Sequence, residues 1–201
     1  MEKPSKTGLF FGSFDPVHIG HLIIAEYMHM HTDLQKIWFV ISPVNPHKTH
    51  QSQTDSQTRL EMLHLALDDN QAFQLCDIEL DMPQPNYTIY TLRKLKDKYP
   101  EKNFVLIIGS DNLEGFEKWK DHKEILEMTE IYVYPRNVKK VKSRLSQIKS
   151  VHIIEAPLLE LSSTIIRKGF ARGLETKYML HEKVYKFIKE NNLYQEDQSE
   201  T

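Results

Sequence analysis

The alternation of short apolar runs with helix-like segments most constrains how this 201-residue chain can fold. The apolar runs are rich in β-branched or aromatic residues and are bounded by polar, proline or glycine residues, which is typical of strands. They predict strands over residues 7–12, 36–42, 73–79, 103–110, 130–136 and 151–157. Helical spacing of apolar residues fills the segments between them. Helices are predicted over 20–31, around the stripe Leu60, Leu63 and Leu67, over 88–100, and around Leu180, Val184, Phe187 and Ile188.

Strands that alternate with helices indicate βαβ units and a parallel sheet. We therefore expect an α/β protein with a Rossmann-like, doubly wound, mainly parallel sheet, helices on both faces and a small helical C-terminal part. The length suits one domain. We place it over residues 1–194 and expect a frayed tail over 195–201.

The charge balance, the apolar runs and the cysteine content exclude several classes of function. The formal net charge is −2, from 26 Lys+Arg against 28 Asp+Glu, which gives no basic excess for nucleic-acid or membrane-surface binding. No apolar run is long enough for a signal peptide or a membrane span, so we expect a cytoplasmic protein. The single cysteine, Cys76, lies in a predicted strand and is expected to be a buried, unreactive thiol.

In open α/β sheets the ligand lies beyond the carboxyl ends of the strands. Glycine, histidine, lysine, arginine and hydroxyl side chains recur in the segments that follow the predicted strands. These segments read GSFDPVHIGH, PVNPHK, GSDN, YPRN and LLELSSTIIR. The pattern predicts an anion-binding edge assembled from loops that are far apart in sequence.

The first of these segments supplies two histidines at a predicted helix start. Gly12 and Ser13 allow a tight turn, and the helix is expected to begin near residues 17–20. His18 and His21 can then face one side, where free backbone N–H groups favour a triphosphate. The pair could also be half of a zinc site, but no cysteine or carboxylate at ligand spacing accompanies it, so no metal ligand is predicted. The P-loop and dinucleotide patterns are absent.

GSFDPVHIGH resembles the (H/T)xGH signature of the nucleotidyltransferase superfamily, and LSSTIIR (161–167) resembles the second half of that signature. Together with PHK, YTIYTL (87–92), and GSD followed by a tryptophan, these motifs resemble bacterial nicotinate-nucleotide adenylyltransferases over residues 7–194. The resemblance implies transfer of AMP from ATP to nicotinate mononucleotide by direct in-line attack, giving deamido-NAD and pyrophosphate in NAD biosynthesis. It also implies Mg²⁺, bound with ATP. The sequence leaves open whether the chain forms a homo-oligomer.

The resemblance implies a role for each matching residue. The catalytic group is His18, His21, Lys48 and Arg167. The ATP-binding residues are Gly12, Ser13, Phe14, His18, His21, Gly109, Asp111, Ser162, Ser163, Thr164 and Arg167. The mononucleotide-binding residues are Asp15, Lys48, Tyr87, Thr88, Trp119 and Arg136.

Other interpretations stay open at this stage. Ser162 to Thr164 could simply cap a helix, Asp111 could cap a helix over DNLEGFEKW, Lys48 could be a solvated lysine and Trp119 a packing residue. Pantetheine-phosphate adenylyltransferases usually carry Thr at the position of His18 and have shorter chains. A non-catalytic nucleotide sensor is the alternative from another class, although such proteins typically lose the cations that this chain keeps. The choice between nicotinate and nicotinamide is not readable from the sequence.

Overall fold

The computed structural model describes residues 5–43, 54–136 and 144–195, and its strands form one parallel sheet. The order along the sheet is β3-β2-β1-β4-β5-β6, and every neighbouring pair is parallel. The strands are β1 (Lys6–Gly12), β2 (Leu34–Ile41), β3 (Phe73–Cys76), β4 (Asn103–Gly109), β5 (Glu130–Tyr134) and β6 (Val151–Ile153). The order reverses between β1 and β4, which is the doubly wound arrangement predicted from the sequence.

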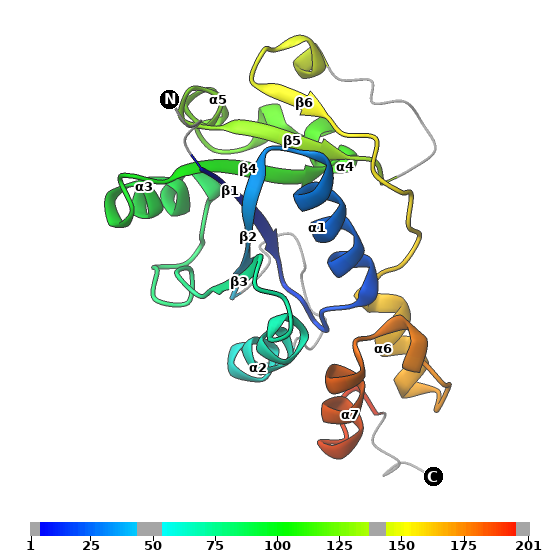
Figure 1. Ribbon diagram of the computed structural model, residues 1–201. Coiled ribbons are helices and arrows are strands. Elements are labelled where there is room, and N and C mark those ends of the chain that lie inside the picture. Colours follow the sequence, from blue (N-terminus) through cyan, green and yellow to red (C-terminus); the bar gives the residue numbers. More distant parts are fainter. Residues whose placement is uncertain (1–4, 44–53, 137–143, 196–201) are drawn as a thin grey trace.

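Helices connect the strands and cover the sheet (Figure 1). They are α1 (Ile19–His31), α2 (Ser56–Leu67), α3 (Thr88–Lys98), α4 (Ser110–Glu114), α5 (His122–Met128), α6 (Ser163–Ala171) and α7 (Glu182–Glu190). Short 3₁₀ turns span Phe116–Lys118, Arg144–Gln147 and Lys177–Met179. None of the helices in the described ranges is both long and apolar enough to cross a membrane.

The core consists of two layers, one on each face of the sheet. Phe10 and Phe39 point into a cluster with residues of α1, α2, α6 and α7. Leu9 and Trp38, their neighbours along β1 and β2, point into the opposite cluster with residues of α3, α4 and α5. Since successive side chains of a strand face opposite sides, apolar residues in both registers bury the central strands completely.

The C-terminal helices pack onto the first of these layers. Val184 and Ile188 of α7 belong to the same apolar cluster as α1 and α2. At the surface, Lys183 Nζ lies 3.2 Å from Asp68 Oδ2 and 3.0 Å from Asp69 Oδ1, at the end of α2. Figure 1 shows α6 and α7 side by side at one end of the molecule, away from β5 and β6. The small helical C-terminal part is therefore confirmed.

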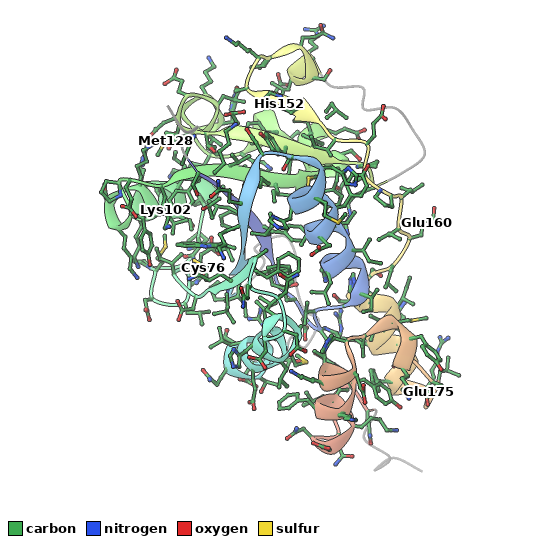
Figure 2. The ribbon with its side chains drawn as sticks, viewed as in Figure 1. Cys76, Lys102, Met128, His152, Glu160 and Glu175 are labelled. Carbon is green, nitrogen blue, oxygen red and sulfur yellow. The ribbon has the colours of Figure 1, made fainter. Side chains whose placement is uncertain are left out.

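A charged cluster occupies the amino-terminal edge of the sheet, opposite to the edge where ligands are expected. Lys6 Nζ lies 2.8 Å from Asp33 Oδ2 and 2.7 Å from Glu130 Oε1. The Tyr132 hydroxyl donates to Asp33 Oδ1 over 2.5 Å. His152 of β6, labelled in Figure 2, has its Nε2 3.0 Å from Glu130 Oε2.

Four local predictions needed correction. The strand predicted over 151–157 ends at Ile153. The strand predicted over 73–79 ends at Cys76, because the chain turns where the Leu80 N–H donates to the Asp77 carbonyl. The segment DNLEGFEKW is not one helix, because α4 ends before Gly115 and a 3₁₀ turn follows. Its first helix starts at Ser110, so Asp111 lies inside the first turn and does not cap it. Cys76 itself is buried on β3 (Figure 2), and burial raises the pKa of its thiol to about 11.

Candidate active site

The loop from β1 to α1 is tightly packed and conformationally unusual. Phe14 has a φ of 47°, a left-handed conformation that is rare for an aromatic residue, and it is 1% exposed. Its ring packs against Phe39, with 5.5 Å between centroids. A Cβ atom on Gly12 would lie 2.9 Å from the Phe14 ring, so glycine is needed for this approach. The loop is therefore held in one shape by the aromatic core beneath it.

The two histidines of the motif lie together at the start of α1. His18 is the N-cap residue and His21 lies one turn later. Their rings stack with 3.7 Å between centroids, and the His18 N–H donates to His21 Nδ1 over 3.2 Å. A Cβ atom on Gly20 would lie 3.0 Å from His18 Nδ1, so the intervening glycine makes room for the ring. The predicted helix start and the shared face of the two imidazoles are both confirmed.

His18 is a buried and neutral histidine. Burial and, secondarily, the nearby Arg136 guanidinium lower the pKa of His18 to about 4. Its ring is 3% exposed, and within the described ranges Nδ1 is a buried atom with no hydrogen-bond partner. At neutral pH this imidazole offers a neutral N–H or a lone pair to a ligand rather than a positive charge.

The lowered pKa makes folding stability depend on pH. The unfolded chain binds the His18 proton near pH 6.5, whereas the folded chain binds it near pH 4. Stability therefore rises with pH between these values, and the gain, at most about 3 kcal/mol, is lost as the pH falls from 6.5 to 4. In His18→Gln, which does not titrate, we expect the free energy of unfolding from urea titrations to fall less over this range. Parallel pH curves for the two proteins would contradict a neutral, buried His18.

The second signature segment lies against this loop, although it is far away in sequence. Ser163 Oγ donates to the Pro16 carbonyl over 2.9 Å, and Arg167 Nη1 donates to the Asp15 carbonyl over 2.7 Å. Ser162 is the N-cap of α6, and its hydroxyl accepts from the Ile165 N–H over 3.3 Å. Capping is thus real, but among the three hydroxyl residues only Ser162 performs it, whereas Ser163 and Arg167 join the two halves of the signature.

Asp15 is the most enclosed polar residue of the loop. The residue is 1% exposed, and Oδ1 accepts from the Tyr194 hydroxyl over 2.7 Å. Its other oxygen lies 3.8 Å from Arg167 Nη1. The sequence assigned Asp15 to the mononucleotide, whereas the structure places its carboxylate between Tyr194 and Arg167.

Gly109, Asp111 and Arg136 form the part of the site at the ends of β4 and β5. Arg136 Nη1 lies 3.4 Å from Asp111 Oδ2, and the Arg136 N–H donates to Ser110 Oγ over 3.0 Å. A Cβ atom on Gly109 would lie 2.6 Å from Arg136 Cδ, so the glycine lets this side chain cross the end of the strand. Together with both histidines, Arg136 lines a small cavity of about 20 Å³.

A larger pocket, of about 540 Å³, opens on the other side of the same loop. Gly12 and Ser13 line it, as do Tyr87, Thr88 and Trp119. Trp119 is half-buried, and its ring lies 5.1 Å from that of Phe116. Trp119 therefore packs against the core and lines the pocket at the same time, so the two interpretations of this residue are compatible.

Two residues of this region were missed by sequence reasoning. Arg59 is 1% exposed, and its guanidinium donates to the carbonyls of Ser13 (2.7 Å), Ser42 (2.8 Å) and Pro43 (2.7 Å). It thereby joins the ends of β1 and β2 to α2. The signal for it was spacing, because Arg59 falls in register with Met62, Leu63, Ala66 and Leu67 on the buried stripe of α2.

Glu79 is the second missed residue. It is 3% exposed, lines the larger pocket and accepts from Thr91 Oγ1 over 2.7 Å. Burial raises the pKa of this carboxyl group. Asn86, which also lines the pocket, donates to the Glu79 carbonyl over 2.8 Å.

The chain is similar to known proteins along most of its length. Residues 9–169 match the family model described as cytidylyltransferase-like. The chain belongs to this family. Its similar relatives include probable nicotinate-nucleotide adenylyltransferases of Christiangramia forsetii, 45% identical over 94% of this chain and 98% of the relative, and of Bacteroides fragilis, 43% identical over 92% and 91%.

Solved structures of the same fold are also similar. A Plasmodium falciparum nicotinic acid mononucleotide adenylyltransferase, complexed with NaAD, gives a TM-score of 0.79 at 21% identity and covers 94% of this chain and 97% of its own. A putative nicotinate-nucleotide adenylyltransferase from Vibrio parahaemolyticus gives 0.71 at 20% identity, covering 96% of each chain. At these identities the likeness shows the shared fold.

Two predicted features fall outside the described residues. Lys48 and the tail from residue 196 onward lie outside the described ranges. Within those ranges, no three His, Cys, Asp or Glu side chains gather as a metal-binding group.

Proposed function

We propose that this member of the family is a nicotinate-nucleotide adenylyltransferase. It transfers AMP from ATP to nicotinate mononucleotide, and the products are deamido-NAD and pyrophosphate. The names of the relatives that match over nearly the whole chain support this activity.

One structural observation carries the proposal: the loop from β1 to α1 lines two cavities. His18 and His21 line the cavity beside Arg136, and Gly12 and Ser13 line the larger aromatic pocket. An enzyme that joins two nucleotides must hold both on either side of the reacting phosphorus. The cavity of about 20 Å³ is only large enough for a water-sized group. The loop nevertheless presents both histidines there and borders the larger pocket with Gly12 and Ser13, so it can align two nucleotides.

The reaction needs alignment more than proton transfer. A phosphate monoester has a second pKa near 6, so the attacking oxygen of the mononucleotide is already ionised at neutral pH. It attacks the α-phosphorus of ATP in line, and the bond from that phosphorus to the pyrophosphate oxygen breaks. The site must stabilise the negative charge that moves onto pyrophosphate, and no covalent intermediate or general base is required.

We assign the ATP phosphates to the signature residues. His21 and the first N–H groups of α1 donate to the α-phosphate, and His18 assists as a neutral imidazole. Ser162, Ser163 and Thr164 at the start of α6, with Arg167, hold the β- and γ-phosphates. Gly109 and Asp111 face the nucleoside of ATP, and Lys48 is proposed as a further phosphate ligand. Phe14 holds the loop between β1 and α1 in place by packing into the core.

We assign the mononucleotide to the larger pocket. Trp119 offers a face on which the pyridine ring can stack, and the first turn of α3 at Tyr87 and Thr88 offers backbone N–H groups to the nicotinate carboxylate. Lys120, whose Nζ lies 5.1 Å from the Tyr87 ring centroid, adds a positive charge to this pocket. Arg136 is the proposed ligand of the mononucleotide phosphate. Asp15 supports the loop rather than contacting this substrate.

Mg²⁺ is proposed to enter with ATP. This ion usually keeps several water ligands and binds through substrate phosphates. It would neutralise part of the triphosphate charge, while the side chains above orient the two nucleotides.

The proposal is tested by measuring pyrophosphate release with Mg²⁺-ATP and three acceptors: nicotinate mononucleotide, nicotinamide mononucleotide and phosphopantetheine. We expect the highest kcat/KM with nicotinate mononucleotide. A parallel series with CTP checks the nucleotide, because the family takes its description from cytidylyl transfer. Release only with phosphopantetheine, or only with CTP, would overturn the proposal. ATP binding without release would favour a nucleotide sensor.

Trp119→Ala tests whether Trp119 binds the mononucleotide rather than ATP. Loss of the stacking face should raise the KM for nicotinate mononucleotide about tenfold or more, because aromatic stacking on a base contributes about 1–3 kcal/mol. The KM for ATP should stay within about twofold. Steady-state kinetics with each substrate varied in turn measures both constants.

The matched control for this variant is Tyr178→Ala, which removes an aromatic side chain that is 91% exposed and does not line the pocket. Its kinetics should equal those of the unchanged protein. An increase in the KM for ATP instead of that for the mononucleotide would place Trp119 at the adenine.

A further inference from the structure

We infer that Tyr194, near the C-terminus, is a positioning residue for the ATP half of the site. Its hydroxyl holds the Asp15 carboxylate, and this sets the distance between that carboxylate and Arg167, which the proposed function assigns to the phosphates. The inference rests on the proposed function, because it assumes that Arg167 binds the triphosphate.

The chain turns sharply to bring Tyr194 to this place. After α7, Asn192 has a φ of 52° and Tyr194 a φ of 64°. Left-handed conformations at residues other than glycine cost about 1 kcal/mol or more and persist only where the surroundings enforce them. The Leu193 N–H donates to the Ile188 carbonyl over 3.0 Å, which closes the end of α7. Two such residues so close together indicate that the position of the Tyr194 side chain is strongly determined.

The Tyr194 hydroxyl makes a specific set of contacts. It donates to Asp15 Oδ1 over 2.7 Å, and Met62 Sδ lies 3.9 Å from the hydroxyl oxygen. Its ring lies 6.3 Å from that of Phe170 on α6. Burial and the adjacent Asp15 charge raise the pKa of Tyr194, so its hydroxyl remains a donor across the working pH range. The hydroxyl thus bridges the C-terminal part and the β1–α1 loop.

Asp15 interacts with two guanidinium groups as well as with this hydroxyl. Its carbonyl accepts from Arg167 Nη1 over 2.7 Å, while its carboxylate Oδ2 lies 3.8 Å from the same nitrogen. Arg59 adds a favourable charge interaction from the opposite side. Oδ2 is itself buried without a hydrogen-bond partner among the described residues. This carboxylate therefore has unused capacity for a donor, and Arg167 is the nearest cation.

Removing the Tyr194 hydroxyl should change the partner of Asp15. A buried carboxylate that loses a hydrogen bond is costly unless it finds another donor. Asp15 would then turn toward Arg167 and form a close ion pair. Arg167 would be drawn away from the phosphates, and the loop that carries His18 would shift with Asp15. By holding Oδ1, Tyr194 keeps Oδ2 at 3.8 Å from Arg167 Nη1.

Tyr194→Phe tests the inference, because it keeps the ring and removes only the hydroxyl. We expect ATP to bind about tenfold more weakly by calorimetry, and kcat/KM for ATP to fall about tenfold or more. The KM for nicotinate mononucleotide should change less than twofold. Urea titration of each protein sets a temperature at which it is fully folded, so that lost stability does not enter the kinetics.

The matched control is Tyr185→Phe. Tyr185 lies on α7, its ring lies 6.1 Å from that of Phe170, and its hydroxyl interacts with Glu175 instead of with the loop. We expect its ATP affinity and kinetics to be unchanged. A second variant, Tyr194→Phe combined with Asp15→Asn, should recover part of the ATP affinity, since the neutral amide no longer pairs with Arg167.

The outcomes are distinct. Unchanged ATP affinity and kinetics in Tyr194→Phe would overturn the inference, as would a lower urea midpoint with unchanged kinetics, which indicates a purely structural residue. Equal losses in Tyr185→Phe would also overturn it. If the unchanged protein binds ATP but transfers no adenylyl group, the proposed function fails. The calorimetric comparison of Tyr194→Phe still tests the coupling to ATP in that case.

Discussion

Replacing His21 with alanine should lower turnover by about two to three orders of magnitude and leave the fold intact, because removing one preorganised donor to developing charge has effects of this size. His21 accepts from the His18 N–H and stacks on the His18 ring, so it also sets the position of the second histidine. Pyrophosphate release at saturating ATP and nicotinate mononucleotide measures kcat. Circular dichroism and a urea titration report whether the fold is retained.

His31→Ala is the control for this prediction. His31 lies in the last turn of the same helix and stacks on Tyr27, with 4.1 Å between ring centroids. The variant loses an imidazole from α1 without touching the site, and its turnover should be close to that of the unchanged protein. A folded His21→Ala protein with near-normal kcat would remove His21 from the catalytic assignment.

Replacing Arg59 with methionine is expected to give the largest loss of stability. The methionine side chain can fill much of the space, but the carbonyls of Ser13, Ser42 and Pro43 lose their buried donor. Each unsatisfied buried carbonyl costs about 1–3 kcal/mol, so we expect the free energy of unfolding to fall by at least about 3 kcal/mol. Urea titration followed by fluorescence measures this loss.

Arg93→Met is the matched control, because it removes a guanidinium that is 43% exposed and pairs with Glu124 on the surface. Such a pair contributes about 1 kcal/mol or less. Arg59→Lys should rescue little, since one ammonium group cannot reach the carbonyls that two guanidinium nitrogens span. Similar small losses for both methionine variants would mean that water replaces the Arg59 contacts and that Arg59 does not fix the strand ends.

The secondary structure was predictable where a short stretch of sequence is enough to identify the element. The apolar runs of β1 and β4 are buried on both faces, so they stand out without any alternation of polar residues. The end of β3 was not predictable in this way, because Ile78 continues the apolar pattern although the backbone has already turned. The break in DNLEGFEKW is equally hidden, since Gly115 is tolerated inside many helices and here it ends one.

The residues of the candidate site likewise fall into those that local sequence patterns identify and those that only the folded structure reveals. His18, His21 and the serines before α6 belong to contiguous motifs at strand or helix ends, which sequence reasoning recognises. Arg59 and Tyr194 act through contacts that only the folded chain creates. A backbone carbonyl has no side-chain identity, so nothing in the sequence marks Ser13 or Pro43 as a partner of an arginine. Tyr194 binds a side chain, but one that is 179 positions away, so no local spacing relates the two. Single residues whose partners are distant in sequence are therefore the part that sequence patterns miss.

The contact between Tyr194 and Asp15 has a consequence for synthesis of the protein. The two residues are 179 positions apart, and Arg167 lies 152 positions after the carbonyl that it binds. Translation proceeds at about 5–20 residues per second, so Asp15 is added to the chain roughly 10–40 s before Tyr194. During that interval the sheet can assemble without a complete phosphate site. The nascent chain can therefore become competent for ATP only after Tyr194 has been added.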